Sequence, residues 1–129
     1  MNLSSGIDLI EIERIQNALD RYGERFTQRI YTPAEIKSAR GNAAELAARF
    51  AAKEAASKAL GTGIGPVSWK EIETLNKPSG KPFLRLSGRA QAIAQAQGYE
   101  TWSVSLTHSR GMAAAVVVCI GASFPTEDR

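Results

Sequence analysis

The feature that most constrains the fold is a long helical run from about Ala43 to Leu60. This run is rich in alanine, the residue with the highest helix propensity, and Gly61 follows it as a natural C-terminal stop. The whole chain has 129 residues, of which 43% are hydrophobic and 22% are charged. This length and composition favour one compact domain that contains the helix.

The N-terminal segment changes its apolar period partway through. Three neighbouring apolar residues predict a short buried strand, and they are Ile7, Leu9 and Ile10. The apolar residues that follow are spaced as on one face of a helix, and Gly23 is a natural stop for it. They are Ile12, Ile15, Leu19 and Tyr22.

The rest of the chain mixes helical and extended patterns. Thr32-Pro33-Ala34-Glu35 predicts a helix start with a capping box, and Ser87 is expected to cap a third helix that ends at Gly98. Strands are predicted at residues 67–75, 83–86, 102–108 and 112–120, with turns at 77–82 and 109–111. We therefore expect an α+β domain over residues 1–121 and a C-terminal tail over residues 122–129.

The charge and cysteine content exclude several protein classes. The formal net charge is +3 and the isoelectric point is near 9.2, which suits an anionic ligand or an acidic partner. Cys119 is the only cysteine, so an internal disulfide and a four-cysteine zinc site are excluded. There is no basic n-region or long apolar run at the N-terminus, and no apolar stretch long enough to span a membrane. We expect a cytoplasmic protein without a membrane partner.

Several basic residues near the N-terminus are spaced as on one side of a helix. Arg14, Ala18, Arg21 and Arg25 are spaced 4, 3 and 4 residues apart. On a continuous helix they would lie roughly 100° around the axis from the apolar face. The stretch over residues 12–25 has as many acidic as basic residues, so the arrangement of the basic residues is more informative than its net charge.

Two acidic positions are candidates for chemistry. Asp8 lies inside an apolar run, where a carboxylate is costly unless it meets a cation or a metal, although an edge-strand aspartate in water is an equal alternative. Glu54, Ser57 and Lys58 would share one helix face, which taken alone is better explained by a surface salt bridge. Asp8 and Glu54 together would suit Mg²⁺ if phosphate and water completed its shell, with Lys58 as a point charge for phosphate.

A glycine-rich loop and a single histidine are the remaining candidates. Residues 61–65 (GTGIG) resemble a phosphate cradle, but they lack the Gly-Lys-Ser/Thr ending of a P-loop and follow a helix rather than open one. A nucleotide triphosphatase is therefore disfavoured. A helix C-cap followed by a turn explains these glycines at least as well as a ligand-binding loop does. His108 lies at a strand end, and a structural role and contact with a phosphate or ribose are equally open.

Three segments together resemble one family. They are GIDLIEIERI at residues 6–15, RFAAKEAASKALGTG at 49–63 and VSLTHS at 104–109. The chain is similar to the holo-(acyl-carrier-protein) synthase family, the short phosphopantetheinyl transferases of fatty-acid synthesis, over nearly its whole length. The resemblance implies the 4′-phosphopantetheinyl transferase fold, in which an antiparallel sheet packs against helices. It also implies transfer of 4′-phosphopantetheine from coenzyme A to a serine of apo acyl carrier protein, with release of adenosine 3′,5′-bisphosphate.

The resemblance also assigns roles to the candidate residues. It implies that Asp8 and Glu54 hold Mg²⁺ against the pyrophosphate of coenzyme A and that Lys58 stabilises the charge that builds on the phosphoryl oxygens. Either carboxylate is a candidate base, acting through water, for the serine proton. Four further residues are assigned to coenzyme binding, of which Arg49 and His108 contact the adenosine and its 3′-phosphate. The four are Arg49, Ser57, Gly61 and His108.

Two expectations concern partners. The arginines Arg14, Arg21 and Arg25 would face the acidic helix of the carrier protein. Arg49 and Lys58 are nine positions apart, and therefore about 180° apart around one helix, so one coenzyme can meet both only if it lies between two subunits. We expect an active site shared across a subunit interface, with Arg49 from the neighbouring chain. The homotrimer implied by the family fits this expectation.

Two rival functions belong to other classes, and one lies within the enzyme class. A small basic module that grips RNA would explain the isoelectric point and the arginine stripe, but only nine aromatic residues are present and no aromatic pair lies on a predicted strand. We therefore expect no nucleic-acid partner. A structural or assembly protein gives no reason for Asp8. A relative that modifies carrier domains of secondary metabolism is the nearer rival, and the short chain favours the fatty-acid type.

Overall fold

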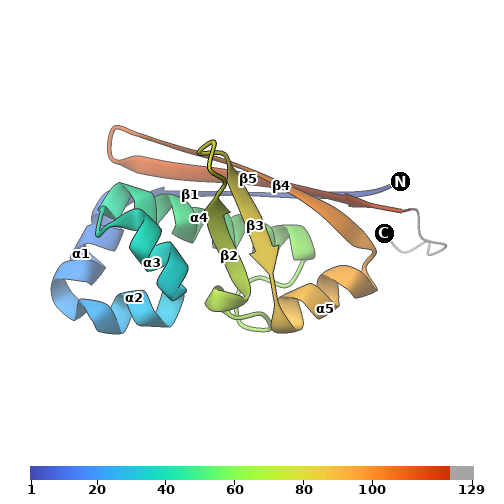
Figure 1. Ribbon diagram of the computed structural model, residues 1–129, viewed down its shortest axis with the longest axis horizontal. Coiled ribbons are helices and arrows are strands. Elements are labelled where there is room, and N and C mark those ends of the chain that lie inside the picture. Colours follow the sequence, from blue (N-terminus) through green and yellow to red (C-terminus); the bar gives the residue numbers. More distant parts are fainter. Residues whose placement is uncertain (123–129) are drawn as a thin grey trace.

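The computed structural model describes residues 1–122 and contains a three-stranded sheet, a two-stranded sheet and helices that lie mainly on one side of the larger sheet (Figure 1). The elements in chain order are β1 (Asn2–Glu11), α1 (Ile12–Tyr22), α2 (Glu24–Ile30), α3 (Pro33–Ala39), α4 (Ala43–Leu60), the 3-10 helix η1 (Trp69–Glu71), β2 (Ile72–Asn76), β3 (Pro82–Leu86), α5 (Gly88–Ala96), β4 (Tyr99–Ser109) and β5 (Met112–Gly121). The predicted α+β class is confirmed. The predicted tail, apart from Ala122, lies outside the described residues.

The larger sheet is antiparallel, with the order β1-β5-β4. The turn between β4 and β5 is made by Arg110 and Gly111, whose φ angles of 53° and 81° are left-handed. Helix α4 lies against one face of this sheet, with α1 to α3 at one end of the molecule and α5 at the other (Figure 1). The predicted turn and both long strands are therefore present.

Helix α4 forms the centre of the core because its side chains are small. It begins with Asn42 as N-cap, which accepts a hydrogen bond from the Glu45 amide at 3.0 Å, and ends at Gly61 with a φ of 82°. Its buried alanines are exposed by 3% or less, and they are Ala47, Ala48, Ala51, Ala52, Ala55, Ala56 and Ala59. Such side chains allow strands and helices to approach the α4 backbone from several sides at once.

The orientation of β1 differs from the prediction. Ile10 is buried, but Ile7 and Leu9 are 66% and 64% exposed, so the expected burial of these two residues is wrong. The β1 residues that face α4 are those at even positions, Asp8 among them. Along this face β1 carries Asn2, Ser4, Gly6 and Asp8 before Ile10, so the close approach of α4 is made mainly with small or polar side chains, and Leu3, Ile7 and Leu9 lie on the other face of the sheet.

The first helix ends at Gly23, as predicted, but two details of its surface differ. Ile15 is buried, whereas Tyr22 is 47% exposed and does not extend the buried face. Arg25 lies on a separate helix, α2, because Gly23 breaks the chain with φ 55° and ψ −128°, a conformation that side-chain-bearing residues avoid. The four-position stripe on one continuous helix is therefore wrong at Arg25.

The segment expected as a strand over 67–75 begins differently. Ser68 opens η1 with a capping box to Glu71, so strand β2 starts only at Ile72. The hairpin of β2 and β3 stands apart from the larger sheet as a two-stranded unit. The capping box predicted at Thr32 and Glu35 is present at the start of α3.

Candidate functional site

Asp8 and Lys58 meet where β1 crosses the C-terminal half of α4. The Lys58 ammonium donates to Oδ1 of Asp8 at 3.1 Å and to the carbonyl oxygen of Ile7 at 2.9 Å. The Asp8 side chain is 18% exposed and that of Lys58 is 51% exposed. Asp8 therefore meets a cation at a partly covered position on an edge strand, and its role as a metal ligand stays a prediction.

Glu54 lies one helical turn before Lys58 and is half-buried. Burial and the nearby charge of Asp8 raise the pKa of the Glu54 carboxyl, and the charge of Lys58 opposes this shift. Two carboxylates that repel each other in this way are suited to share a divalent cation. Within residues 1–122 there is no cluster of three or more His, Cys, Asp or Glu that would enclose a metal. The pair therefore fits Mg²⁺, which usually takes one or two protein carboxylates and fills its shell with water and phosphate oxygens.

Ser57 and Gly61 serve the helix itself. The Ser57 side chain is fully buried and its hydroxyl donates to the carbonyl oxygen of Glu54 at 2.7 Å, so it does not share the exposed face with Glu54 and Lys58. The Gly61 amide donates to the carbonyl oxygen of Lys58 at 3.0 Å, which closes the C-terminus of α4. Both positions have structural contacts, and their part in coenzyme binding stays a prediction.

Arg49 points to the other side of α4. Its side chain is 2% exposed and its guanidinium donates to Oγ of Ser38 at 3.0 Å, to Oδ1 of Asn76 at 2.9 Å and to both the carbonyl oxygen and Oε1 of Glu45 at 3.0 Å. These partners lie on α3, β2 and α4, whereas Lys58 contacts β1. Within one chain, Arg49 and Lys58 therefore belong to two separate clusters, in agreement with their spacing.

His108 belongs to the Arg49 side. Its Nε2 lies 3.8 Å from Oε2 of Glu45, the same carboxylate whose other oxygen accepts from Arg49. Both the His108 and the Glu45 side chains are 46% exposed. The structure therefore brings together the two residues expected to bind the adenosine and its 3′-phosphate, and Glu45 joins them. The sequence analysis did not single out Glu45.

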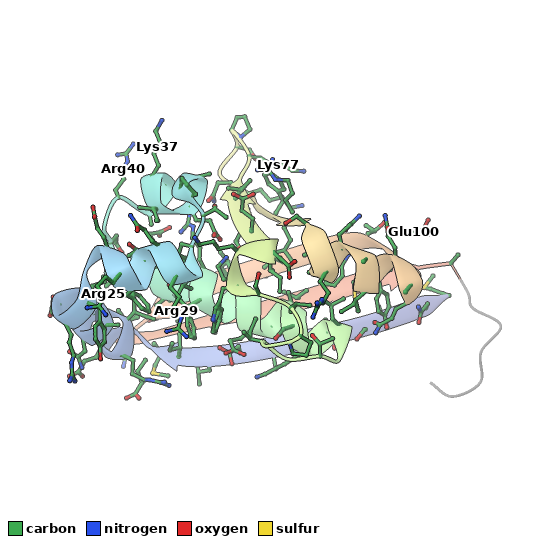
Figure 2. All side chains as sticks on the ribbon, turned by 90° about the horizontal axis from the view of Figure 1, so that it is seen from below. Arg25, Arg29, Lys37, Arg40, Lys77 and Glu100 are labelled. Carbon is green, nitrogen blue, oxygen red and sulfur yellow. The ribbon has the colours of Figure 1, made fainter. Side chains whose placement is uncertain are left out.

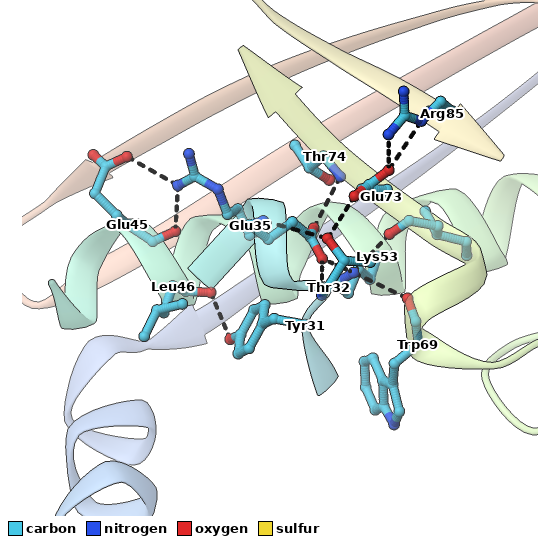
Figure 3. Close-up of polar contacts among 12 residues, drawn as sticks. Tyr31, Thr32, Glu35, Glu45, Leu46, Lys53, Trp69, Glu73, Thr74 and Arg85 are labelled. Carbon is cyan, nitrogen blue, oxygen red and sulfur yellow. Dashed lines mark hydrogen bonds and ion pairs between the residues drawn. The ribbon is translucent and has the colours of Figure 1, made fainter. Parts of the chain in front are cut away.

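A buried ion pair between Lys53 and Glu35 was also missed from the sequence (Figure 3). Both side chains have 0% exposure, and Nζ of Lys53 lies 2.8 Å from Oε1 of Glu35. Nζ also donates to the carbonyl oxygens of Trp69 at 3.0 Å and Ile72 at 2.7 Å. Burial lowers the pKa of Lys53, and the Glu35 carboxylate counters this effect. The pair connects α3, α4, η1 and β2 in one place.

Further hydrogen bonds extend this network toward the hairpin. Oε2 of Glu35 accepts from the Thr74 amide at 2.9 Å, and the Thr32 hydroxyl donates to Glu73 at 2.5 Å (Figure 3). Glu73 in turn accepts from Arg85 on β3 at 2.7 Å. The network therefore holds β2 against α4, beside the position where Asn76 meets the Arg49 guanidinium.

The three arginines predicted to bind a partner are all exposed. Arg14 and Arg21 lie on α1 and Arg25 lies on α2, where it lines a groove with Tyr22, Phe26 and Arg29. Figure 2 shows Arg25 and Arg29 along the same helix. Basic side chains beside exposed aromatic surface suit an acidic, amphipathic partner.

Comparison with known proteins identifies the family. The family model of the 4′-phosphopantetheinyl transferase superfamily matches residues 4–117. The chain belongs to this superfamily. A relative named holo-(acyl-carrier-protein) synthase from Herpetosiphon aurantiacus is 51% identical over 126 residues, covering 92% of this chain and 99% of the relative. The resemblance described from the three motifs is therefore confirmed.

Solved structures of superfamily members agree with the fold. A holo-(acyl-carrier-protein) synthase from Helicobacter pylori, in complex with coenzyme A, has a TM-score of 0.83 and 34% identity and covers 90% of this chain and 99% of its own. A holo-(acyl-carrier-protein) synthase from Bacillus anthracis, in complex with coenzyme A (3′,5′-ADP), has a TM-score of 0.78 and 38% identity, with 95% and 100% coverage. The expected 4′-phosphopantetheinyl transferase fold is confirmed.

Proposed function

We propose that this chain transfers 4′-phosphopantetheine from coenzyme A to a serine of apo acyl carrier protein. The observation that carries the proposal is the meeting of Asp8 and Lys58 at 3.1 Å, with Glu54 one turn away on α4. Family membership and the coenzyme A bound to the Helicobacter pylori relative support the same reaction. The name of the Herpetosiphon aurantiacus relative includes the acyl carrier protein, and the role in fatty-acid synthesis is part of this proposal.

The reaction moves one phosphoryl group. The serine oxygen bonds to the phosphorus that carries the pantetheine, and the bond from that phosphorus to the oxygen of adenosine 3′,5′-bisphosphate breaks. The leaving bisphosphate keeps the electron pair of that bond, and the serine proton goes to a base. Asp8 or Glu54, acting through water, is the nearest candidate for that base, and the raised pKa of Glu54 suits it to hold a proton.

The chain's own residues orient and neutralise the phosphates. Asp8 and Glu54 would hold Mg²⁺, which supplies charge neutralisation on the pyrophosphate when bound. Lys58 is half-exposed, and it would exchange its contact with Asp8 for the phosphoryl oxygens as negative charge develops there. The exchange keeps the ammonium paired with an anion at every stage.

A homotrimer with shared sites is part of the proposal. One sheet face carries exposed apolar side chains, and in the described residues no helix lies on it (Figure 1). These side chains are Leu3, Ile7, Leu9, Val116 and Val118. An apolar face of this kind suits contact with further copies of the chain. Such contact would place Arg49 and His108 of one subunit near the Asp8 cluster of its neighbour.

The arginine-lined surface of α1 and α2 is proposed as the carrier-protein site. Arg14, Arg21 and Arg25 are exposed there, and their charges would steer an acidic helix into contact. Because such steering is screened by salt, the KM for the carrier protein should rise with ionic strength, while the KM for coenzyme A should change less.

We also propose a cytoplasmic location, as expected from the sequence. Cys119 is a free, buried thiol, and burial raises its pKa to about 11, which disfavours the reactive thiolate. Separately, among the described helices none is both long and apolar enough to cross a membrane.

Intact-mass measurement tests the function. Apo acyl carrier protein is incubated with this protein, coenzyme A and Mg²⁺, and an Asp8→Asn variant is run in parallel. The mass of the carrier protein should increase by one phosphopantetheine, and the increase should disappear with a chelator or with the variant. No increase with several carrier proteins would contradict the proposal.

A further inference from the structure

We propose that Glu45 is an internal counterion that occupies the 3′-phosphate position until the nucleotide binds. Its carboxylate lies between Arg49 at 3.0 Å and His108 at 3.8 Å, one oxygen toward each. These are the two residues assigned to the adenosine 3′-phosphate, so the inference rests on the proposed function. A phosphate that enters between them would replace one anion by another.

The Arg49 guanidinium is held in place without this carboxylate. Ser38, Asn76 and the carbonyl oxygen of Glu45 are neutral acceptors at 2.9 to 3.0 Å, and they would keep their hydrogen bonds when the Glu45 side chain moves. Asn76 is itself fixed, because its amide donates to the carbonyl oxygen of Gly80 at 2.9 Å across the hairpin turn. The basic group is therefore preorganised and only its counterion is exchangeable.

Arg49 also has one hydrogen-bond donor that none of these partners uses. Its Nε is buried and has no hydrogen-bond partner within residues 1–122. In the same region, Glu45 is the one carboxylate in ion-pair contact with Arg49, and its side chain is 46% exposed. A buried cation with three neutral acceptors and one exposed anion is suited to exchange that anion for a ligand.

The exchange has a direct consequence for selectivity. Glu45 stabilises the empty site, and it must leave when a 3′-phosphate binds, so it weakens binding of nucleotides that carry this phosphate. Nucleotides that lack the phosphate leave the carboxylate in place and are not penalised. Since surface ion pairs contribute about 0.2–1 kcal/mol, Glu45→Gln should strengthen binding of the phosphorylated nucleotide by roughly 1.4- to fivefold.

The test compares matched ligands with and without the phosphate. Affinities are measured by calorimetry for adenosine 3′,5′-bisphosphate and adenosine 5′-monophosphate, and KM values are measured for coenzyme A and dephospho-coenzyme A. Glu45→Gln should improve only the two ligands that carry a 3′-phosphate. The control Glu100→Gln makes the same charge change at the other end of β4, about 26 Å along the strand from His108, and should improve none of them (Figure 2).

A third variant separates this inference from the function on which it rests. His108→Ala should weaken only the 3′-phosphorylated ligands, because the histidine is exposed and is not part of the core. If His108→Ala affects both ligand classes equally, the placement of the 3′-phosphate is wrong, and the Glu45 inference is wrong with it. If His108→Ala behaves as expected but Glu45→Gln binds all ligands like the unmodified protein, the phosphate site is correct and the counterion inference alone is overturned.

Discussion

Gly6 on β1 lies directly against the Ala55 backbone on α4. A Cβ atom at Gly6 would lie 1.9 Å from the carbonyl oxygen of Ala55 and 2.9 Å from the Ala59 amide nitrogen. Two positions along the strand on either side, the Ser4 hydroxyl donates to the Ala59 carbonyl oxygen at 2.7 Å and Asp8 meets Lys58. The absence of a side chain at Gly6 therefore sets how closely Asp8 approaches α4.

Gly6→Ala should destabilise the fold and separate Asp8 from Lys58. The added methyl group has backbone atoms as neighbours, which cannot rotate away, so we expect a loss of about 2–4 kcal/mol in the free energy of unfolding, measured by urea denaturation. Ser5→Ala, at the exposed neighbouring position, is the control and should change stability by less than about 0.5 kcal/mol. Equal stability of Gly6→Ala and the unmodified protein would contradict the close approach.

Glu54→Gln should stabilise the metal-free protein while it abolishes transferase activity. Since the pKa of Glu54 is raised in the folded state, its ionised form disfavours folding at neutral pH, and the neutral amide removes this penalty. Because the side chain is only half-buried, we expect a gain of about 1–3 °C in the melting temperature without metal. A lower melting temperature for Glu54→Gln would show that the carboxylate stabilises the apo fold.

The gain from Glu54→Gln should depend on pH in a definite direction. In the folded protein Glu54 takes up its proton at a higher pH than in the unfolded chain, so protonation favours the folded state. As the pH falls from neutral through the raised pKa, the penalty disappears and the difference between the variant and the unmodified protein should shrink. Thermal unfolding in chelator-treated buffers across this range measures the difference.

Lys53→Met should be strongly destabilising although Lys53 is outside the proposed active site. It leaves the Glu35 carboxylate buried without its cation and removes three hydrogen bonds, for an expected cost of about 3–5 kcal/mol in denaturant unfolding. The double variant Lys53→Met/Glu35→Gln removes both charges and should recover part of this loss. A double variant less stable than Lys53→Met alone would mean that the two charges do not act as a pair.

Mixed oligomers should recover activity if sites are shared between subunits. Arg49→Met retains most of the buried volume of the side chain, and Lys58→Ala changes a half-exposed one. Each variant alone should be inactive, whereas an equimolar mixture refolded together should regain up to about a quarter of the sites, since each such site needs one intact residue from each neighbour. Thermal unfolding of each variant confirms that it folds, and no regained activity from folded variants would contradict sharing.

The exposed apolar sheet face should determine the oligomeric state. Val118→Glu places a charge in the middle of this face and should convert the oligomer to monomers with a large loss of activity, as measured by light scattering after size exclusion. Gln16→Glu adds the same charge on the exposed surface of α1 and should leave the mass unchanged. An unmodified protein that runs as a monomer would contradict the proposed interface.

The sequence predicted the parts of the fold whose signals are local. The bounds of α4, the capping box of Thr32 and Glu35, and the stop at Gly23 all depend on residues within one or two helical turns. The short helix α2 was not predicted, because seven residues carry little periodicity. The side of β1 that faces the core was also not predictable, since the alternation of Ile7 and Leu9 with polar residues fits either face until α4 is known to be lined with alanine.

The candidate site was predictable only for the residues that lie in the family motifs. Asp8, Glu54 and Lys58 were identified from the resemblance and from the cost of an acid among apolar residues, and the structure brings Asp8 to Lys58. Lys53 and Glu35 were missed because charged residues are rarely fully buried, and nothing local marks them as partners eighteen positions apart. The available signal was the alanine-rich sequence around Lys53, since its small side chains indicate a part of the helix that is covered by other elements.

Helix α4 carries Arg49 near its start and Lys58 near its end, and between them nearly every residue is buried. We expect a helix enclosed in this way to exchange most of its amide hydrogens through opening of the whole domain. Local unfolding of α4 that removes one polar cluster and leaves the other intact is therefore not expected. We expect the two clusters to form together when the chain folds and to be lost together when it unfolds. In the proposed oligomer, a subunit would therefore contribute to both of its neighbouring sites or to neither.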